Sequence, residues 1–256
     1  MSTTEMQGTP PIDPELNLVL PGRGLPVGSG WGWIVEGWGL FVRAPLMWIV
    51  SIVILFVIAL VMNFVPLIGT LAFQLLQPVF AAGLVVACRS LEKGGEFELE
   101  HLFAGFRRRL GSLVVVGLLF MLGWIAIALV FMAFVGISLL GAFITGDAGA
   151  MMTALATSAT SMMLGVLVAL GLMVPLMAAY WFAPALVIMH DMAPIAAMKE
   201  SFFACFRNFF GFVLYGIVMT VGALFAALPF GLGFLVWMPV AIASTYVAYR
   251  QIFTEG

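Results

Sequence analysis

The sequence predicts an all-α integral membrane protein with six transmembrane helices, and three observations support this prediction. The chain of 256 residues is 64% hydrophobic and only 9% charged. Its mean hydropathy of +1.19 exceeds what a globular core could bury, so lipid must solvate part of the apolar surface. A six-helix topology also places all ten Lys and Arg residues on one side of the membrane, which the positive-inside rule identifies as the cytoplasmic side.

The ends of the chain and its acidic residues fit the same topology. All of the 12 acidic residues except Asp147 lie in segments predicted to be cytoplasmic. Residues 1–30 are rich in proline and glycine and lack the apolar stretch of a signal peptide, which predicts a disordered cytoplasmic tail. Residues 252–256 form a short cytoplasmic C-terminus. We therefore expect a membrane protein with both its N- and C-termini in the cytoplasm.

Six apolar runs form the predicted spans of a single membrane domain at residues 31–251. They are residues 46–65, 71–91, 111–145, 150–189, 209–228 and 230–249. The first two and the last two are each close to the roughly 20 residues that cross a bilayer. The third and fourth are long enough to hold extra helical segments, and residues 151–163 are predicted to extend from the outer surface. An odd extra crossing would place basic residues outside, so six spans are predicted.

Three polar segments each contain a glutamate followed seven residues later by an arginine. The pairs are Glu36 and Arg43, Glu100 and Arg107, and Glu200 and Arg207. Seven residues make nearly two helical turns, so both charges lie on one face, and the opposite face is largely apolar in each segment. In the first segment that face consists of Trp31, Ile34, Val35, Trp38 and Phe41. This pattern predicts three amphipathic helices lying in the membrane interface.

The same three segments suggest an internal repeat. Each precedes a pair of apolar runs, and the second run of each pair contains a proline: Pro78, Pro184 and Pro239. We therefore predict three tandem units of an amphipathic helix followed by a helical hairpin. Their predicted bounds are residues 31–91, 97–190 and 194–251.

Several local strings resemble an uncharacterised family of six-helix bacterial inner-membrane proteins. They include Gly37-Trp38-Gly39-Leu40-Phe41, His101-Leu102-Phe103-Ala104-Gly105-Phe106 and Tyr246-Val247-Ala248-Tyr249-Arg250. The segment 184–212 is also distantly similar to the membrane domain attached to some glycerophosphodiester phosphodiesterases. The resemblance covers about residues 31–253 and implies a helical membrane architecture. It implies no activity, because those phosphodiesterases hold their catalysis in a separate soluble domain.

The residues needed for membrane chemistry are missing from the predicted spans. The topology places no ionisable residue near the middle of a span, where transporters and intramembrane proteases usually carry one. The histidines His101 and His190 and the cysteines Cys88 and Cys205 have no metal-ligand spacing. His190 beside Asp191 is either a proton-transfer pair or the polar boundary of a span. We expect no enzyme activity, no cofactor, no metal and no nucleic-acid partner.

The candidate contact residues are charged and lie in the predicted interfacial helices. Arg107, Arg108 and Arg109 form the densest basic cluster, which either binds anionic lipid head groups or only holds its loop in the cytoplasm. The three Glu/Arg pairs either join neighbouring units or form a solvated polar face. Small residues in the third and fourth runs suit close helix packing, in a homo-oligomer or with a membrane-protein partner.

These patterns lead to two functional hypotheses. The first is a non-enzymatic multi-pass protein that binds membrane lipid or a partner through its cytoplasmic interfacial helices. The alternative is a passive transporter or channel-like permease for a small or amphiphilic solute, because proline-interrupted helices often line transport sites. The sequence does not identify a substrate, a partner or an oligomeric state.

Overall fold

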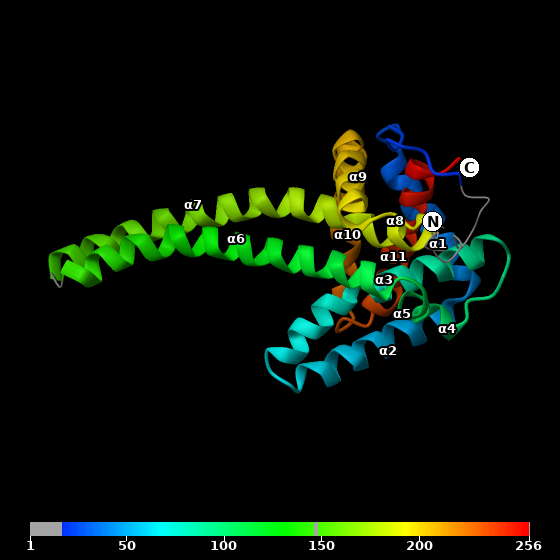
Figure 1. The fold of residues 1–256 in the computed structure, drawn as a ribbon, viewed down its shortest axis with the longest axis horizontal. Helices are drawn as coiled ribbons and strands as arrows, with labels where there is room; N and C mark the ends of the chain where they lie inside the picture. Colours follow the sequence, from blue (N-terminus) through cyan, green and yellow to red (C-terminus); the bar gives the residue numbers. More distant parts are fainter. Residues whose placement is uncertain (1–16, 146–147, 256) are drawn as a thin grey trace, which may run out of the picture. The chain divides into compact units, whose positions relative to one another are not determined.

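The computed structural model describes residues 17–145 and 148–255, so Asp147 lies outside the described residues. The described residues are helical apart from loops and an isolated antiparallel bridge between Leu18 and Thr254. Their helices are α1 (Ser29–Arg43), α2 (Pro45–Asn63), α3 (Ile68–Glu92), α4 (Leu99–Leu102), α5 (Ala104–Arg108), α6 (Leu110–Thr145), α7 (Ala148–Trp181), α8 (Ala183–His190), α9 (Pro194–Arg207), α10 (Phe209–Ala227) and α11 (Phe234–Phe253) (Figure 1).

The chain divides into two compact units. The first unit contains residues up to Gly117 and from Ala179 onward, and the second unit is Leu118–Ala178. The first unit therefore holds α1 to α5, the start of α6, the end of α7, and α8 to α11. All ten Lys and Arg residues of the sequence belong to this first unit.

The core of the first unit forms where α1, α3 and α11 meet. Helix α1 packs against α11 and α10, whereas α3 packs against α4, α5, α8 and α11. The largest fully buried side chains of this unit are aromatic, and they include Trp33, Trp48, Phe182, Tyr246 and Phe253. Helices α2 and α3 form a hairpin that turns at residues 64–67.

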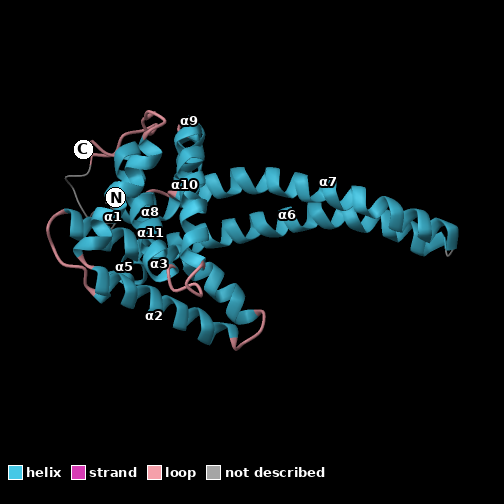
Figure 2. Cartoon of the chain, turned by 180° about the vertical axis from the view of Figure 1, so that it is seen from behind, coloured by secondary structure: helices cyan, strands magenta, loops and turns pink. Residues whose placement is uncertain are grey.

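The second unit is a helical hairpin made from parts of α6 and α7 (Figure 2). Gly123 of α6 lies directly against the Leu176 side chain of α7, and Gly165 of α7 lies against Phe131 and Phe134. Helix α6 has 36 residues, which corresponds to about 54 Å at 1.5 Å per residue. That length exceeds the roughly 30 Å of bilayer hydrocarbon, as the length of the third apolar run predicts.

Five helical segments are long and apolar enough to cross a membrane. They are Pro45–Asn63, Ile68–Glu92, Leu110–Phe134, Thr160–His190 and Phe209–Ala227. The all-helical membrane class predicted from the sequence is therefore confirmed, but six spans are not. Helix α11 has 20 residues and is not among these five segments.

The three predicted interfacial segments are helical, but they differ from the sequence analysis in two respects. The first and third are the single helices α1 and α9, but the second is broken at Phe103 into α4 and α5. In α1, Ile34 and Phe41 are buried against neighbouring helices, whereas Trp31, Val35 and Trp38 remain exposed. The predicted apolar face of α1 is thus two faces, because tertiary packing covers one side of the helix. The grouping into three tandem repeats stays a prediction.

Residues 17–28 differ from the predicted disordered tail. The backbone N–H of Val19 donates to the Phe253 carbonyl, and that of Arg23 donates to the Ile252 carbonyl, both at 2.8 Å. The Arg23 guanidinium also donates to the Thr254 carbonyl. Pairing with the end of α11 gives this segment the backbone partners that a disordered tail would find only in water. The remainder of the predicted tail, residues 1–16, lies outside the described residues.

Close approach of α1 to α11 yields the first prediction. A Cβ atom added at Gly37 would lie 2.6 Å from the backbone nitrogen of Ser244, whereas one added at Gly39 would meet nothing within 4 Å. We expect Gly37→Ala to destabilise the detergent-purified protein by about 1–3 kcal/mol, because a backbone contact must open. Gly39→Ala is the matched control in the same helix and should be neutral or stabilise by up to about 1 kcal/mol.

Thermal unfolding of both variants, followed by circular dichroism, measures the difference. Equal melting temperatures for the two variants would contradict the close contact between α1 and α11.

Candidate functional site

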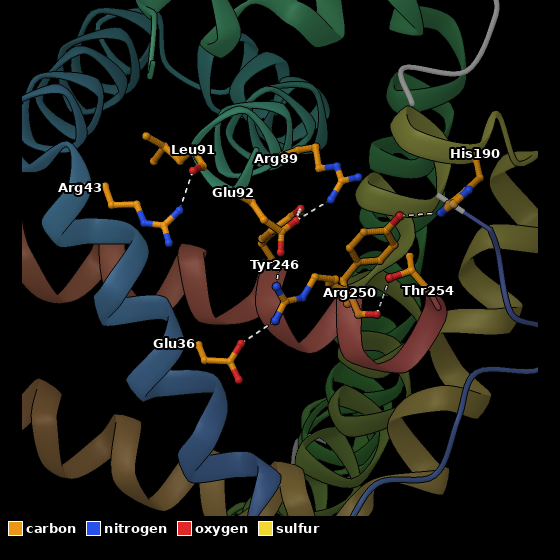
Figure 3. Close-up of polar contacts among 10 residues, drawn as sticks. Glu36, Arg43, Arg89, Leu91, Glu92, His190, Tyr246, Arg250 and Thr254 are labelled. Carbon is orange, nitrogen blue, oxygen red and sulfur yellow. Dashed lines mark hydrogen bonds and ion pairs between the residues drawn. The ribbon is translucent and has the colours of Figure 1, made fainter. Parts of the chain in front are cut away.

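The strongest polar feature of the first unit is a cluster of side chains around Glu92, at the C-terminal end of α3 (Figure 3). We call it the Glu92 cluster. Its members come from α1, α3 and α11 and are Glu36, Arg89, Glu92, Tyr246, Arg250 and Gln251. Helical spacing explains part of it, since Arg89 and Glu92 are three residues apart and Tyr246 and Arg250 are four apart, so each pair shares a face.

Glu92 is the acceptor at the centre of the cluster. Nη1 of Arg89 lies 2.7 Å from its Oε2 atom, and the Tyr246 hydroxyl donates to the same oxygen at 2.5 Å. Arg250 forms an ion pair with its other oxygen, Oε1. The Glu92 side chain is only 17% exposed, so these three donors replace the water that it would otherwise bind.

Arg250 carries the cluster across to α1. Its Nη2 atom lies 2.5 Å from Oε2 of Glu36, and Gln251 donates to Oε1 of Glu36 at 2.8 Å. Nε1 of Trp33 in turn donates to the side-chain amide oxygen, Oε1, of Gln251 at 3.0 Å. Burial lowers the pKa of the Arg250 guanidinium, but the hydrogen bond and charge of Glu92, with the charge of Glu36, outweigh burial and leave that pKa above its usual value. Arg250 therefore stays charged and links three helices.

Arg43 lies at the edge of this cluster, at the C-terminal end of α1. Its Nη1 atom donates to the Leu91 carbonyl at 2.7 Å, close to the end of α3 (Figure 3). Arg43, Glu36, Glu92 and Arg250 also line a small pocket of about 220 Å³. Glu36, which shares a face of α1 with Arg43, contacts Arg250 and Gln251 of α11.

The other predicted contact residues have separate surroundings. Glu100 and Arg107 pair with each other at 2.8 Å, and both side chains are more than two-thirds exposed. Arg109 forms an ion pair with Asp191 instead of facing solvent with its two neighbours. Arg207 donates to the Gly22 carbonyl at 2.6 Å, so it holds the N-terminal segment.

Arg108 and Glu200 complete the predicted set. Arg108 is exposed, and within the described part of the chain no ion pair or hydrogen bond involves its side chain. Glu200 lies in α9, and among the described residues no hydrogen bond or ion pair joins its side chain to another predicted residue. Of the three Glu/Arg pairs singled out in the sequence, Glu100 and Arg107 form an ion pair with each other in the described residues, and the other two do not.

The two histidines have structural partners. Nε2 of His190 lies 2.6 Å from the Tyr249 hydroxyl, while the adjacent Asp191 contacts Arg109. His101 accepts the backbone N–H of Glu98 at 3.2 Å and so helps to cap α4. Among the described residues, no group of three His, Cys, Asp or Glu side chains is placed to hold a metal ion.

Sequence reasoning missed the centre of the cluster, namely Arg89, Glu92, Tyr246 and Arg250. The spacing of Arg89 and Glu92 could have suggested a pair within one helix. Glu92 and Arg250, however, are 158 residues apart, and nothing in their local sequence joins them. The arrangement neutralises the charges at the ends of α3 and α11 and holds these two ends against α1.

Charge neutralisation at Glu92 yields the second prediction. We expect Glu92→Gln to lower the free energy of unfolding by about 2 kcal/mol, because Arg89 and Arg250 lose a shared, partly buried acceptor. The matched control is Glu100→Gln, which removes an exposed pair and should cost less than about 1 kcal/mol. Thermal stability of the two purified variants in one detergent compares them. Equal melting temperatures for the two variants would show that Glu92 is not the central acceptor of the cluster.

Comparison with known proteins supports the membrane assignment. The chain is similar to a probable inner membrane protein of Burkholderia thailandensis, with 29% identity over 246 residues that cover 88% of each chain. No family model matches the chain, and no solved structure matches it. The similarity and the five apolar segments together make this a multi-pass helical protein of the inner membrane. The similarity to the phosphodiesterase membrane domain finds no support in these comparisons.

Proposed function

We propose that this protein is a non-enzymatic inner-membrane protein that binds anionic lipid head groups through short helices at the cytoplasmic face. The observation that carries the proposal is the exposed surface of these helices. In α9, Ile195 is 71% exposed and Phe203 is 50% exposed, and the charged Lys199 lies between them on the same side. An apolar face that carries a cation suits the boundary between acyl chains and anionic head groups.

Helix α1 supports the proposal with a second surface of this kind. Trp31, Val35, Trp38 and Val42 are exposed and recur every three or four residues, so they form one stripe along the helix. Tryptophan is enriched at membrane–water interfaces, where its apolar ring and its polar N–H both find partners. Both α1 and α9 lead directly into candidate spans, α2 and α10, which supports a position at the membrane surface.

The segment with the densest basic charge supplies the head-group contacts in this proposal. Arg107 and Arg108 are exposed at the end of α5, and Arg107 has only an exposed partner, Glu100. Arg109 is engaged with Asp191, and its side chain is 19% exposed, so it has a structural role. We therefore assign lipid binding to Arg107 and Arg108 within the basic cluster.

The proposed topology has six spans with both termini in the cytoplasm. Backbone hydrogen bonds join residues 17–23 to residues 252–255, so these two segments lie on the same side of the membrane. A chain that begins and ends on one side crosses an even number of times. Five apolar segments with α11 as the sixth satisfy this condition, and the positive-inside rule favours the cytoplasm for that side.

The topology gives the third prediction. Green fluorescent protein fused to the C-terminus should fluoresce, and alkaline phosphatase fused there should be inactive, because the first folds in the cytoplasm and the second in the periplasm. A second pair of fusions, at the N-terminus, should give the same result. Opposite results at the two ends would require an odd number of spans and would exclude α11 as the sixth.

The basic pair gives the fourth prediction. We expect the double variant Arg107→Gln/Arg108→Gln to bind vesicles containing phosphatidylglycerol about 30-fold more weakly, since each of the two basic residues near an anionic surface contributes about 1 kcal/mol. The charge-preserving variant Arg107→Lys/Arg108→Lys is the matched control and should bind like the wild type. Co-flotation of the detergent-solubilised protein with vesicles measures the binding of both variants. Unchanged binding of the Gln variant would overturn the lipid proposal.

The alternative function is passive transport of a small or amphiphilic solute. It is favoured by prolines inside the long helices, Pro78 in α3 and Pro239 in α11. Solute uptake into vesicles that contain the protein tests it directly, with protein-free vesicles as the control. A homo-oligomer or a membrane-protein partner also stays a prediction, which cross-linking in the membrane would test.

A further inference from the structure

A pocket lies where α1 ends and α2 begins. It has a volume of about 970 Å³, which is within the range of ligand-binding sites. Its charged lining residues come from the end of α1, from the loop between α3 and α4, and from α4, and they are Arg43, Glu96, Glu98 and Glu100. Its apolar lining residues include Met47, Phe97 and Leu99. The pocket thus offers a cation, carboxylates and an apolar side together.

Only some of these charged groups are available to a ligand. The Glu98 carboxylate accepts the backbone N–H of His101 as the cap of α4, and Glu100 pairs with Arg107. Glu96 is exposed, and in the described part of the chain its carboxylate has no ion pair or hydrogen bond. Arg43 uses one N–H to hold the Leu91 carbonyl, which leaves further donors of its guanidinium free. A ligand would therefore meet one cation and one carboxylate.

The apolar surface beside the pocket identifies the membrane as the source of the ligand. Helix α2 is a candidate span that starts at Pro45, directly after the pocket residue Ala44. Leu46, Val53, Val57 and Val61 are exposed along one side of α2. Their spacings of seven, four and four residues place them in one stripe. Met47 of α2 lines the pocket, and the neighbouring Leu46 begins the exposed stripe.

We infer that this pocket binds the phosphoethanolamine head group of a zwitterionic membrane lipid. The lipid phosphate meets the free N–H donors of Arg43, the ammonium group meets Glu96, and the acyl chains follow the exposed stripe of α2. This inference rests on the proposed lipid-binding function and adds a head group distinct from the anionic lipids that Arg107 and Arg108 bind. Phosphatidylcholine fits less well because its quaternary ammonium has no N–H to donate to Glu96.

Native mass spectrometry of the delipidated full-length protein tests the inference. The protein is titrated in detergent with phosphatidylethanolamine, phosphatidylcholine and phosphatidylglycerol of identical acyl chains. We expect the wild type to prefer phosphatidylethanolamine over phosphatidylcholine about fivefold, which corresponds to about 1 kcal/mol for an exposed ion pair. Equal binding of these two lipids by the wild type would overturn the inference.

Two variants and a control assign the preference to the pocket. Glu96→Gln should abolish the preference for ethanolamine without affecting the fold, since no described interaction depends on its carboxylate. Arg43→Gln should weaken phosphatidylethanolamine and phosphatidylcholine alike, because both carry the phosphate, while Gln keeps a donor for the Leu91 carbonyl. Glu255→Gln removes the same charge from an exposed site outside the pocket and should keep the preference. A preference that survives Glu96→Gln would overturn the inference.

Two further comparisons separate the sources of the ligand and the two proposals. Soluble glycerophosphoethanolamine at the lipid concentration should compete weakly, because it has no acyl chains; competition equal to that of the lipid would overturn the assignment to a membrane lipid. Phosphatidylglycerol binding depends on Arg107 and Arg108 in the proposed function and should be unchanged in Glu96→Gln. If the wild type shows no preference for ethanolamine but its phosphatidylglycerol binding depends on Arg107 and Arg108, this inference fails and the proposed function stands. If phosphatidylglycerol binding does not depend on these arginines, the proposed function fails, and the comparison of phosphatidylethanolamine with phosphatidylcholine still decides this inference.

Discussion

The ion pair between Glu92 and Arg250 is the interaction on which the rest of the first unit depends. It joins the ends of α3 and α11, which are 158 residues apart in the sequence, and Arg250 extends the link to Glu36 in α1. These charges lie at the ends of apolar helices, where an unpaired charge would be costly. Pairing them joins the ends of α3 and α11 to the middle of α1.

This constraint places residues 17–23 beside the end of α11. Because α11 is held at Arg250, its last residues offer their carbonyls to the N-terminal segment at Val19 and Arg23. Asn208 adds a second attachment, since its side chain accepts the Leu25 N–H at 2.7 Å and donates to the Arg23 carbonyl at 2.9 Å. The common position of the ends is the physical reason for favouring an even number of membrane crossings.

Charged side chains in the Glu92 cluster are mostly buried and paired, whereas Arg108 and Glu96 outside it are exposed. The side chains of Glu92 and Arg89 are mostly buried and saturated with partners, so a ligand could reach them only by breaking those pairs. Arg108 and Glu96 are exposed, and their exchange of water for a head group costs little. Ligand recognition is therefore assigned to the second kind of residue, beside the exposed apolar stripes of α1, α2 and α9.

The sequence by itself determined the helical membrane class, because its apolar runs are too long and too many for a soluble core and its basic residues gather between them. It also located α1 and α9 through their helical periodicity, and Arg89 with Glu92 could have been paired from their spacing. Only the tertiary structure decided that Ile34 is buried while Val35 is exposed, and that Glu36 of α1 meets Arg250 of α11. Periodicity fixes which residues share a face, but which neighbour covers that face depends on the path of the whole chain.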